Sequence, residues 1–158
     1  MIHAPFKRED LLTVSEALDI AEDRTGDYFK FSSGQWRRHR YDVRTLSQLA
    51  KNDVLPDVFA LLKKSNKQKE RVEPSARYRD FYFICLQYHR ILDALRRDRD
   101  LGLLPLLVYV FTHELVHIVR FCNFSQRFEV STKDREKEER IVHAATFEIL
   151  KELSLPRL

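Results

Sequence analysis

The chain contains few of the residues that interrupt regular structure. Only 3 of its 158 residues are Gly and 5 are Pro, which is about 5% together, against roughly 12% on average. This scarcity argues against a turn-rich β-sandwich or barrel, and also against low-complexity disorder. Charged residues are common at 33%, above the roughly 25% that is typical of soluble proteins. Few turns and many charges together indicate helices with solvated outer faces.

Cysteine is also scarce, and no long apolar segment is present. The two cysteines, Cys85 and Cys122, are too few for a disulfide framework, so free thiols in a reducing cytoplasm are expected. The N-terminal residues lack the apolar stretch of a secretory signal. The longest apolar run, residues 101–111, has the length of a buried core helix and not that of a membrane span. We therefore expect a cytoplasmic protein that does not associate with a membrane.

Neither sign of charge is in large excess. The formal net charge is +4, which does not by itself indicate a nucleic-acid partner. A basic cluster with flanking aromatic residues occurs at 36–41 (WRRHRY), but no nucleic-acid-binding motif surrounds it. We interpret this cluster as a solvated face, and we expect no nucleic-acid partner.

The length favours a single domain over residues 1–158. Residues 63–77 are charged and polar and have no apolar periodicity, so they mark the best internal boundary. If the chain divides there, an N-terminal lobe (1–64) and a linker (65–74) precede a metal-binding helical part (75–158).

Apolar periodicity predicts a mainly α fold. The expected helices are 13–24 (ended by Gly26), 45–52, 56–64, 74–98, 104–121 and 132–153. Residues 27–44 alone have the pattern of a β-hairpin. Within 74–98, the aromatic-rich segment 78–86 also suits a strand, although the sustained spacing of three and four residues favours a helix. A small sheet beside the helices is therefore the alternative fold.

One motif on the apolar helix 104–121 carries chemistry. His113 and His117 are separated by four residues, in the pattern H-E-x-x-H, with Glu114 between them. The spacing places both imidazoles on one helix face, where they can hold one Zn²⁺. Glu114 lies about 100° away around the helix axis, so it can take a proton from water without binding the metal. Given 6 His in 158 residues, about 0.02 chance matches are expected.

A catalytic zinc takes a third protein ligand and leaves one position open. On a helical wheel of 132–153, Glu139 and His143 lie one turn apart on the apolar side. We expect the C-terminal helix to face the motif helix across one metal ion, with Glu139 as the third ligand. His143 is either a fourth ligand or a group that orients Glu139.

Two further side chains share the face of His113 and His117. Tyr109 lies one turn before His113, and we interpret it as a core residue, although a hydroxyl there could stabilise an oxyanion. Arg120 could pair with an acidic side chain or bind a substrate carboxylate.

The sequence resembles the zincin metallopeptidases, over roughly residues 104–150. The resemblance rests on His113-Glu114-Leu115-Val116-His117 and on Glu139, which follows His117 by 22 positions. This is the arrangement of the gluzincin branch, and it implies that His113, His117 and Glu139 bind zinc and that Glu114 is the general base. Some gluzincins have an acidic residue four positions after the ligand glutamate, where this chain has His143. The resemblance also implies a zincin-like α+β fold, with a small sheet whose edge strand aligns a peptide substrate.

These features predict an enzyme: a small zinc metallopeptidase with one Zn²⁺, in which Glu114 is the base. Its substrate is then a peptide or a protein. The alternative is a non-catalytic protein in which zinc has a structural or regulatory role. The number of ligands distinguishes the two, because four protein ligands close the site and three leave room for water.

Overall fold

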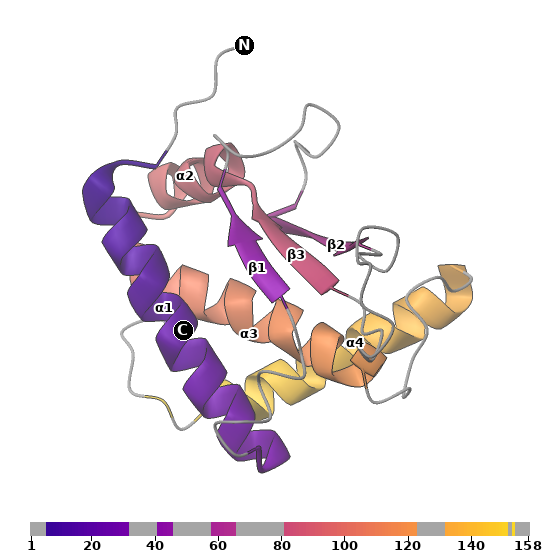
Figure 1. Cartoon of the computed structure of the whole chain (residues 1–158). Coiled ribbons are helices and arrows are strands. Elements are labelled where there is room, and N and C mark those ends of the chain that lie inside the picture. The colour runs from indigo at the N-terminus through magenta and orange to yellow at the C-terminus, as the bar shows by residue number, and fades with distance from the viewer. Residues whose placement is uncertain are drawn as a thin grey trace, which may run out of the picture.

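The computed structural model of the chain describes residues 6–31, 41–45, 58–65, 81–122, 132–151 and 153. Within them the elements, in chain order, are α1 (Arg8–Phe29), β1 (Tyr41–Arg44), β2 (Ala60–Ser65), β3 (Phe81–Leu86), α2 (Tyr88–Arg97), α3 (Leu103–Cys122) and α4 (Thr132–Leu150). The mainly helical fold is therefore confirmed, and a three-stranded sheet accompanies the helices (Figure 1).

Helix α3 occupies the centre of the core, as its apolar sequence predicts. Six of its large apolar side chains have no exposed surface: Leu107, Val108, Phe111, Leu115, Val116 and Ile118. Helices α1 and α4 pack against α3, and the sheet lies across another side of it (Figure 1). The span Leu103–Phe121 is long and apolar enough to cross a membrane, but 67% of it is buried inside the protein. Such burial is typical of the central helix of a globular core.

Helix α1 is longer than its sequence predicts. The expected helix 13–24 ends at Gly26, whereas α1 continues through a buried Gly26 and ends where Lys30 adopts the left-handed conformation, with φ 61°. A glycine inside a helix costs about 1 kcal/mol, which packing against α3 can offset. A row of small side chains at four-residue spacing favours that close approach, and all of them are fully buried: Ala17, Ala21 and Thr25.

The first part of the expected helix 74–98 is a strand. Residues Phe81–Leu86 form β3, and only Tyr88–Arg97 are helical, as α2. Every side chain of β3 after Phe81 is buried. A strand covered on both faces has a continuous apolar run, which periodicity cannot distinguish from a buried helix. Residues 81–86 form a strand and not a helix because they pair with β1 on one side and with β2 on the other.

The sheet order is β1-β3-β2, so β3 is central. Ile84 is paired on one side with Val43 of the parallel strand β1, and on the other with Leu62 of the antiparallel strand β2. These pairings join segments that are far apart in the sequence. The core lies between this sheet and the helices, and β3, the middle strand of the sheet, contributes buried side chains to it.

Two expected elements are corrected by this sheet. The hairpin 27–44 is wrong, because its first residues belong to α1 and its last four form β1, which pairs in parallel with β3. The helix 56–64 is wrong over its second half, because Ala60–Ser65 form β2. In both segments pairing with β3 outweighs the local preference of the chain. Residues 46–52 of the expected helix 45–52 lie outside the described residues.

Most of the buried apolar side chains of the described residues form one cluster, with members from α1, β3, α2, α3 and α4. Most of the proposed linker, residues 66–74, lies outside the described part. The division into lobe, linker and helical part therefore stays a prediction.

Candidate metal centre

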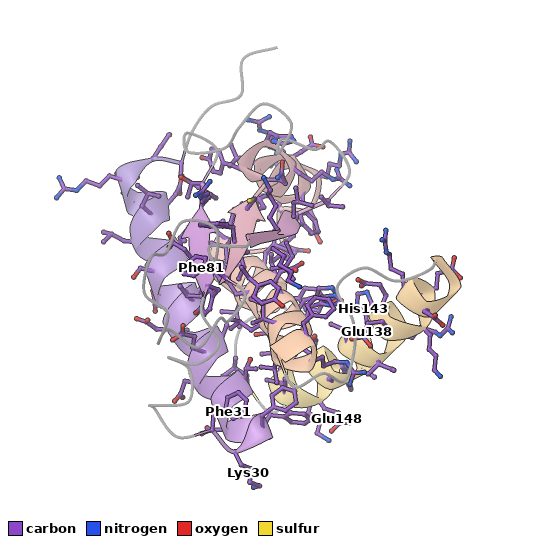
Figure 2. All side chains as sticks on the ribbon, turned by 45° about the vertical axis from the view of Figure 1, so that its right-hand side comes forward. Lys30, Phe31, Phe81, Glu138, His143 and Glu148 are labelled. Carbon is purple, nitrogen blue, oxygen red and sulfur yellow. The ribbon has the colours of Figure 1, made fainter. Side chains whose placement is uncertain are left out.

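The two helices that the sequence predicts to face each other do so. α3 and α4 pack together, and Glu138 and His143 of α4 each contact a side chain of α3 (Figure 2). The rings of His113 and His117 are 4.9 Å apart between centroids, as expected for imidazoles one helical turn apart. Their side chains are only 14% and 10% exposed, so this pair forms the inner wall of the site.

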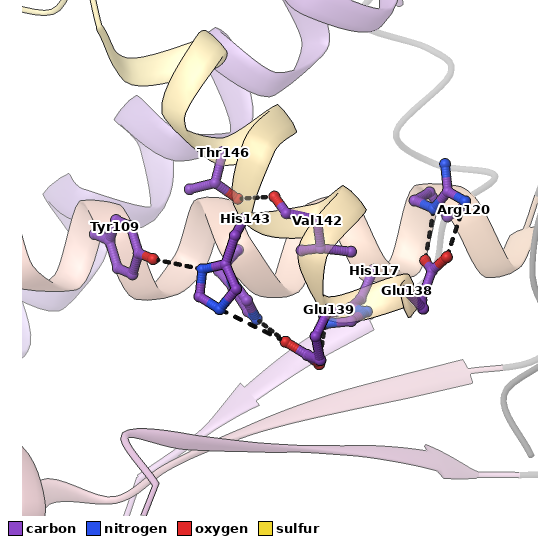
Figure 3. A network of polar contacts seen from close by, with 9 residues as sticks. Tyr109, His117, Arg120, Glu138, Glu139, Val142, His143 and Thr146 are labelled. Atoms are coloured by element: carbon purple, nitrogen blue, oxygen red, sulfur yellow. Dashed lines mark hydrogen bonds and ion pairs between the residues drawn. The ribbon is translucent and has the colours of Figure 1, made fainter. Parts of the chain in front are cut away.

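Glu139 of α4 lies against both imidazoles (Figure 3). Its Oε2 atom is 3.2 Å from Nε2 of His113, and its Oε1 atom is 2.9 Å from Nε2 of His117. One carboxylate thus spans the two histidines of the motif.

His143 completes the cluster on its outer side. Its Nε2 atom lies 3.9 Å from Oε2 of Glu139, and its side chain is 56% exposed. Its ring centroid is 4.7 Å from that of His113. The other ring nitrogen, Nδ1, is 2.9 Å from the hydroxyl of Tyr109, which α3 contributes. His143 is therefore fixed at one nitrogen and directs the other toward Glu139.

The donor atoms fit a metal ion. A tetrahedral ion with bonds of roughly 2.0–2.1 Å holds its donor atoms about 3.3 Å apart. The Oε2 atom of Glu139 lies 3.2 Å from Nε2 of His113 and 3.9 Å from Nε2 of His143, whereas Nε2 of His117 lies 2.9 Å from the other oxygen, Oε1. Donor atoms of His113, Glu139 and His143 all lie within 4.8 Å of one another. This group can hold a metal ion, and imidazole with carboxylate is a donor set that suits Zn²⁺ and several other divalent metals.

The histidines also determine the electrostatics of Glu139. Hydrogen bonds from His113 and His117 hold the pKa of the Glu139 carboxyl well below its usual range. In this arrangement each Nε2–H donates to a carboxylate oxygen, so a metal at these atoms would replace both hydrogen bonds, and the ring proton of each neutral imidazole would move to Nδ1. The Nδ1 atoms of the same two histidines are buried and have no hydrogen-bond partner within the described part of the chain. Among these three histidines, His143 alone has a side-chain partner at its Nδ1 atom within the described residues.

Glu114, the proposed base, is buried with 9% of its surface exposed. Burial raises the pKa of its carboxyl to about 7, with a further increase from the charge of Glu139 and an opposing effect of His113. A carboxyl group with a pKa near neutrality can both accept and return a proton.

An ion pair lies at the other end of the helix interface. The Arg120 guanidinium donates two hydrogen bonds to the Glu138 carboxylate, at 2.5 and 2.8 Å (Figure 3). The side chain of Glu138 is 6% exposed and that of Arg120 is 23% exposed, so the carboxylate of this pair is buried and the guanidinium is partly exposed. Of the two roles considered for Arg120, pairing with an acid is the one observed. The pair and the Tyr109–His143 contact lie on either side of Glu139.

The structure thus places all three proposed histidine ligands, His113, His117 and His143, beside Glu139. Among the described residues, the compact group that can hold a metal ion consists of His113, Glu139 and His143, and His117 lies outside it. Sequence reasoning assigned Tyr109 to the core and gave no role to Glu138. Tyr109 is one turn from His113 on the same face, so its spacing already contained the signal.

No protein-family model matches this sequence, and no curated protein or solved structure was found to be similar to it. The resemblance to zincins therefore rests on the motif and on the site.

Proposed function

We propose that this protein is a metal-dependent hydrolase, most specifically a small zinc metallopeptidase. The observation that carries the proposal is the position of Glu139, whose carboxylate lies against the imidazoles of both motif histidines. Two imidazoles and a carboxylate from two helices are the donor set of many catalytic zinc sites.

His113, His117 and Glu139 would hold one Zn²⁺. When bound, the ion supplies Lewis acidity for the substrate carbonyl and lowers the pKa of water toward neutrality. The motif histidines are both mostly buried, so they hold their positions with little freedom. Buried, prearranged donors are what a catalytic site requires.

Glu114 is the general base in this proposal. Burial raises the pKa of its carboxyl in the metal-free chain, and the positive charge of a bound ion would favour the ionised form that accepts a proton. The carboxylate takes a proton from the attacking water and then returns it to the leaving amine of a peptide bond. The same residue thereby serves both half-steps of hydrolysis.

The sheet supports a peptide or protein substrate. Strand β2 is an edge strand, since it pairs with β3 alone among the described residues, and it lies against α3. An extended peptide can add to such an edge through main-chain hydrogen bonds. The three-stranded sheet is compatible with the alternative fold, a zincin-like α+β fold with a small sheet. The proposal includes no nucleic-acid partner. A cytoplasmic location, suggested by the scarcity of cysteine, is likewise a proposal.

A second candidate is a non-catalytic protein with a structural or regulatory zinc. The observation that favours it is the fourth donor, since Nε2 of His143 lies 3.9 Å from Glu139. Four protein ligands are typical of structural zinc sites.

The first test is the metal content of the full chain, purified without chelator or affinity metal and measured by plasma mass spectrometry. We expect close to one zinc per chain. The His113→Ala/His117→Ala double variant should contain none. If the wild-type chain holds no metal and takes up none from added zinc, both candidate functions are wrong.

The second test is Glu114→Gln, assayed against a mixture of unstructured peptides. Under the hydrolase proposal this variant keeps its zinc but loses turnover, by at least about 100-fold. The matched control is Glu148→Gln, which changes an exposed carboxylate of α4 that pairs with Lys151. If the zinc-loaded wild-type chain cleaves no peptide, the structural candidate is favoured.

A further inference from the structure

The contact between Tyr109 and His143 gives the outer histidine a defined chemical state. The hydroxyl oxygen and Nδ1 are 2.9 Å apart, a distance at which one of them donates to the other. If Nδ1–H donates to the tyrosine oxygen, Nε2 keeps its lone pair. That lone pair then faces the space beside Oε2 of Glu139, 3.9 Å away.

This is the arrangement of a metal-binding histidine and its supporting partner. Such histidines commonly donate the second ring N–H to an oxygen atom, which fixes the tautomer and the orientation of the ring. In the tautomer of His143 that carries its proton on Nδ1, the phenol oxygen of Tyr109 is that acceptor. The two motif histidines have no such partner within the described residues. The separation of 3.9 Å is too long for a hydrogen bond to Glu139, so the imidazole is not held by that carboxylate.

We propose that His143 is a fourth metal ligand, that Tyr109 is the positioning residue which sets it for this role, and that the resting site is closed to water. The inference rests on the metal site of the proposed function and adds a regulatory element to it. The four donors are then three imidazole nitrogens and one carboxylate oxygen.

Exposure distinguishes His143 from the other ligands. Its side chain is 56% exposed, compared with 14% for His113 and 10% for His117. It can therefore move into solvent without opening the core, whereas the motif histidines cannot. A substrate that enters the site displaces His143 and frees the position that water or the substrate carbonyl needs. The bound metal is thus protected from other small ligands until that exchange takes place.

The test uses Co²⁺ as the probe metal, because its visible absorption reports on the number and geometry of its ligands. The metal-free full chain is loaded with one equivalent of Co²⁺ and then titrated with azide, a small anion that binds open metal positions. We expect azide to leave the wild-type spectrum unchanged, at concentrations that fully shift the spectrum of His143→Ala. Tyr109→Phe should lower Co²⁺ affinity about 10- to 100-fold, the usual effect of losing a supporting partner.

Glu148→Gln, on the exposed side of α4, is the matched control and should behave as the wild type. Circular dichroism establishes that each variant is folded, and the exposure of His143 makes its replacement compatible with the fold. If azide shifts the wild-type spectrum as readily as that of His143→Ala, the inference is overturned, while the three-ligand site of the proposed function stands. If the wild-type chain binds no Co²⁺ and no zinc, the metal site itself is wrong and both proposals fail.

Discussion

Arg120 and Glu138 join α3 to α4 through two hydrogen bonds between one guanidinium and one carboxylate, at 2.5 and 2.8 Å. Glu138 is the neighbour of Glu139 in the sequence, and Arg120 follows His117 by three residues. The pair therefore determines where the backbone of α4 passes the motif helix. Its position at the interface links the stability of the helix pair to the geometry of the metal site.

Replacing Arg120 by Ala should lower the free energy of unfolding by about 3 kcal/mol, because it leaves the buried Glu138 carboxylate without its partner. Urea denaturation of the metal-free chain measures this loss. Arg120→Leu combined with Glu138→Leu should restore much of the stability, since two apolar residues need no partner. A loss below about 0.5 kcal/mol for Arg120→Ala, as for an exposed surface pair, would contradict the role given to this interaction.

The second prediction concerns Glu139. Glu139→Gln keeps the size of the side chain but removes its negative charge, so zinc affinity should fall by more than the 10- to 100-fold typical of losing a supporting residue. Competition with a coloured chelator measures the affinity. Wild-type affinity should also fall as the pH is lowered, because the metal binds only unprotonated imidazole and carboxylate groups and therefore competes with protons for them. Affinity that is equal at pH values of about 6 and about 8 would count against these ligands.

A third prediction concerns the contact between α1 and α2. The Tyr88 hydroxyl donates to the Asp10 carboxylate at 2.9 Å. Burial, aided by the hydrogen bond and the charge of Asp10, raises the pKa of Tyr88 to about 12. Because the neutral phenol is favoured in the folded chain, this stabilisation is lost as the pH rises from about 10 to about 12.

Asp10→Asn should lower the pKa of Tyr88 toward 10 and cost about 1 kcal/mol of stability. Phenolate absorbance of the wild type, after subtraction of the same titration for Tyr88→Phe, reports this single group. A Tyr88 pKa that is unchanged in Asp10→Asn would show that the carboxylate has no part in the shift.

More of the metal site than of the sheet could be predicted from the sequence. His113 and His117 lie four residues apart on one helix, so their proximity follows from helix geometry alone. To predict that Glu139 lies near these histidines, only one further assumption was needed, namely that a second amphipathic helix turns its apolar side toward the first. Helical periodicity is a local property, and both inferences depend on little else.

The sheet depends on pairings between distant segments. Val43, Leu62 and Ile84 lie side by side in three strands, but nothing local in β1 or β2 indicates their partner. The continuous apolar run of β3 was misinterpreted because Tyr88 and Ile91 of the following helix extend its apparent helical spacing. The prediction that the first helix ends at Gly26 was wrong for a related reason. Packing of α1 on α3 outweighs the conformational cost of one glycine inside the helix.

The last prediction uses the pKa of Glu114 to test its burial without any metal. Its carboxyl has a pKa of about 7 in the folded chain, compared with the ordinary value of 4.5. Between these two pH values the folded chain holds a proton that the unfolded chain has released, so the free energy of unfolding falls as the pH rises through this window. A shift of this size corresponds to about 3 kcal/mol.

Glu114→Gln removes the titrating group and keeps its shape, so the metal-free variant should lose this decline with pH. Urea denaturation at a series of pH values between about 4.5 and about 7 measures both chains. Glu139 has the opposite effect, because its lowered pKa gives stability that is lost as the pH falls below its ordinary value. That contribution is present in both chains, so it cancels in the difference. If wild-type and Glu114→Gln stabilities change in parallel over this range, Glu114 does not hold its proton near neutrality in the metal-free chain, and the raised pKa of its carboxyl is wrong.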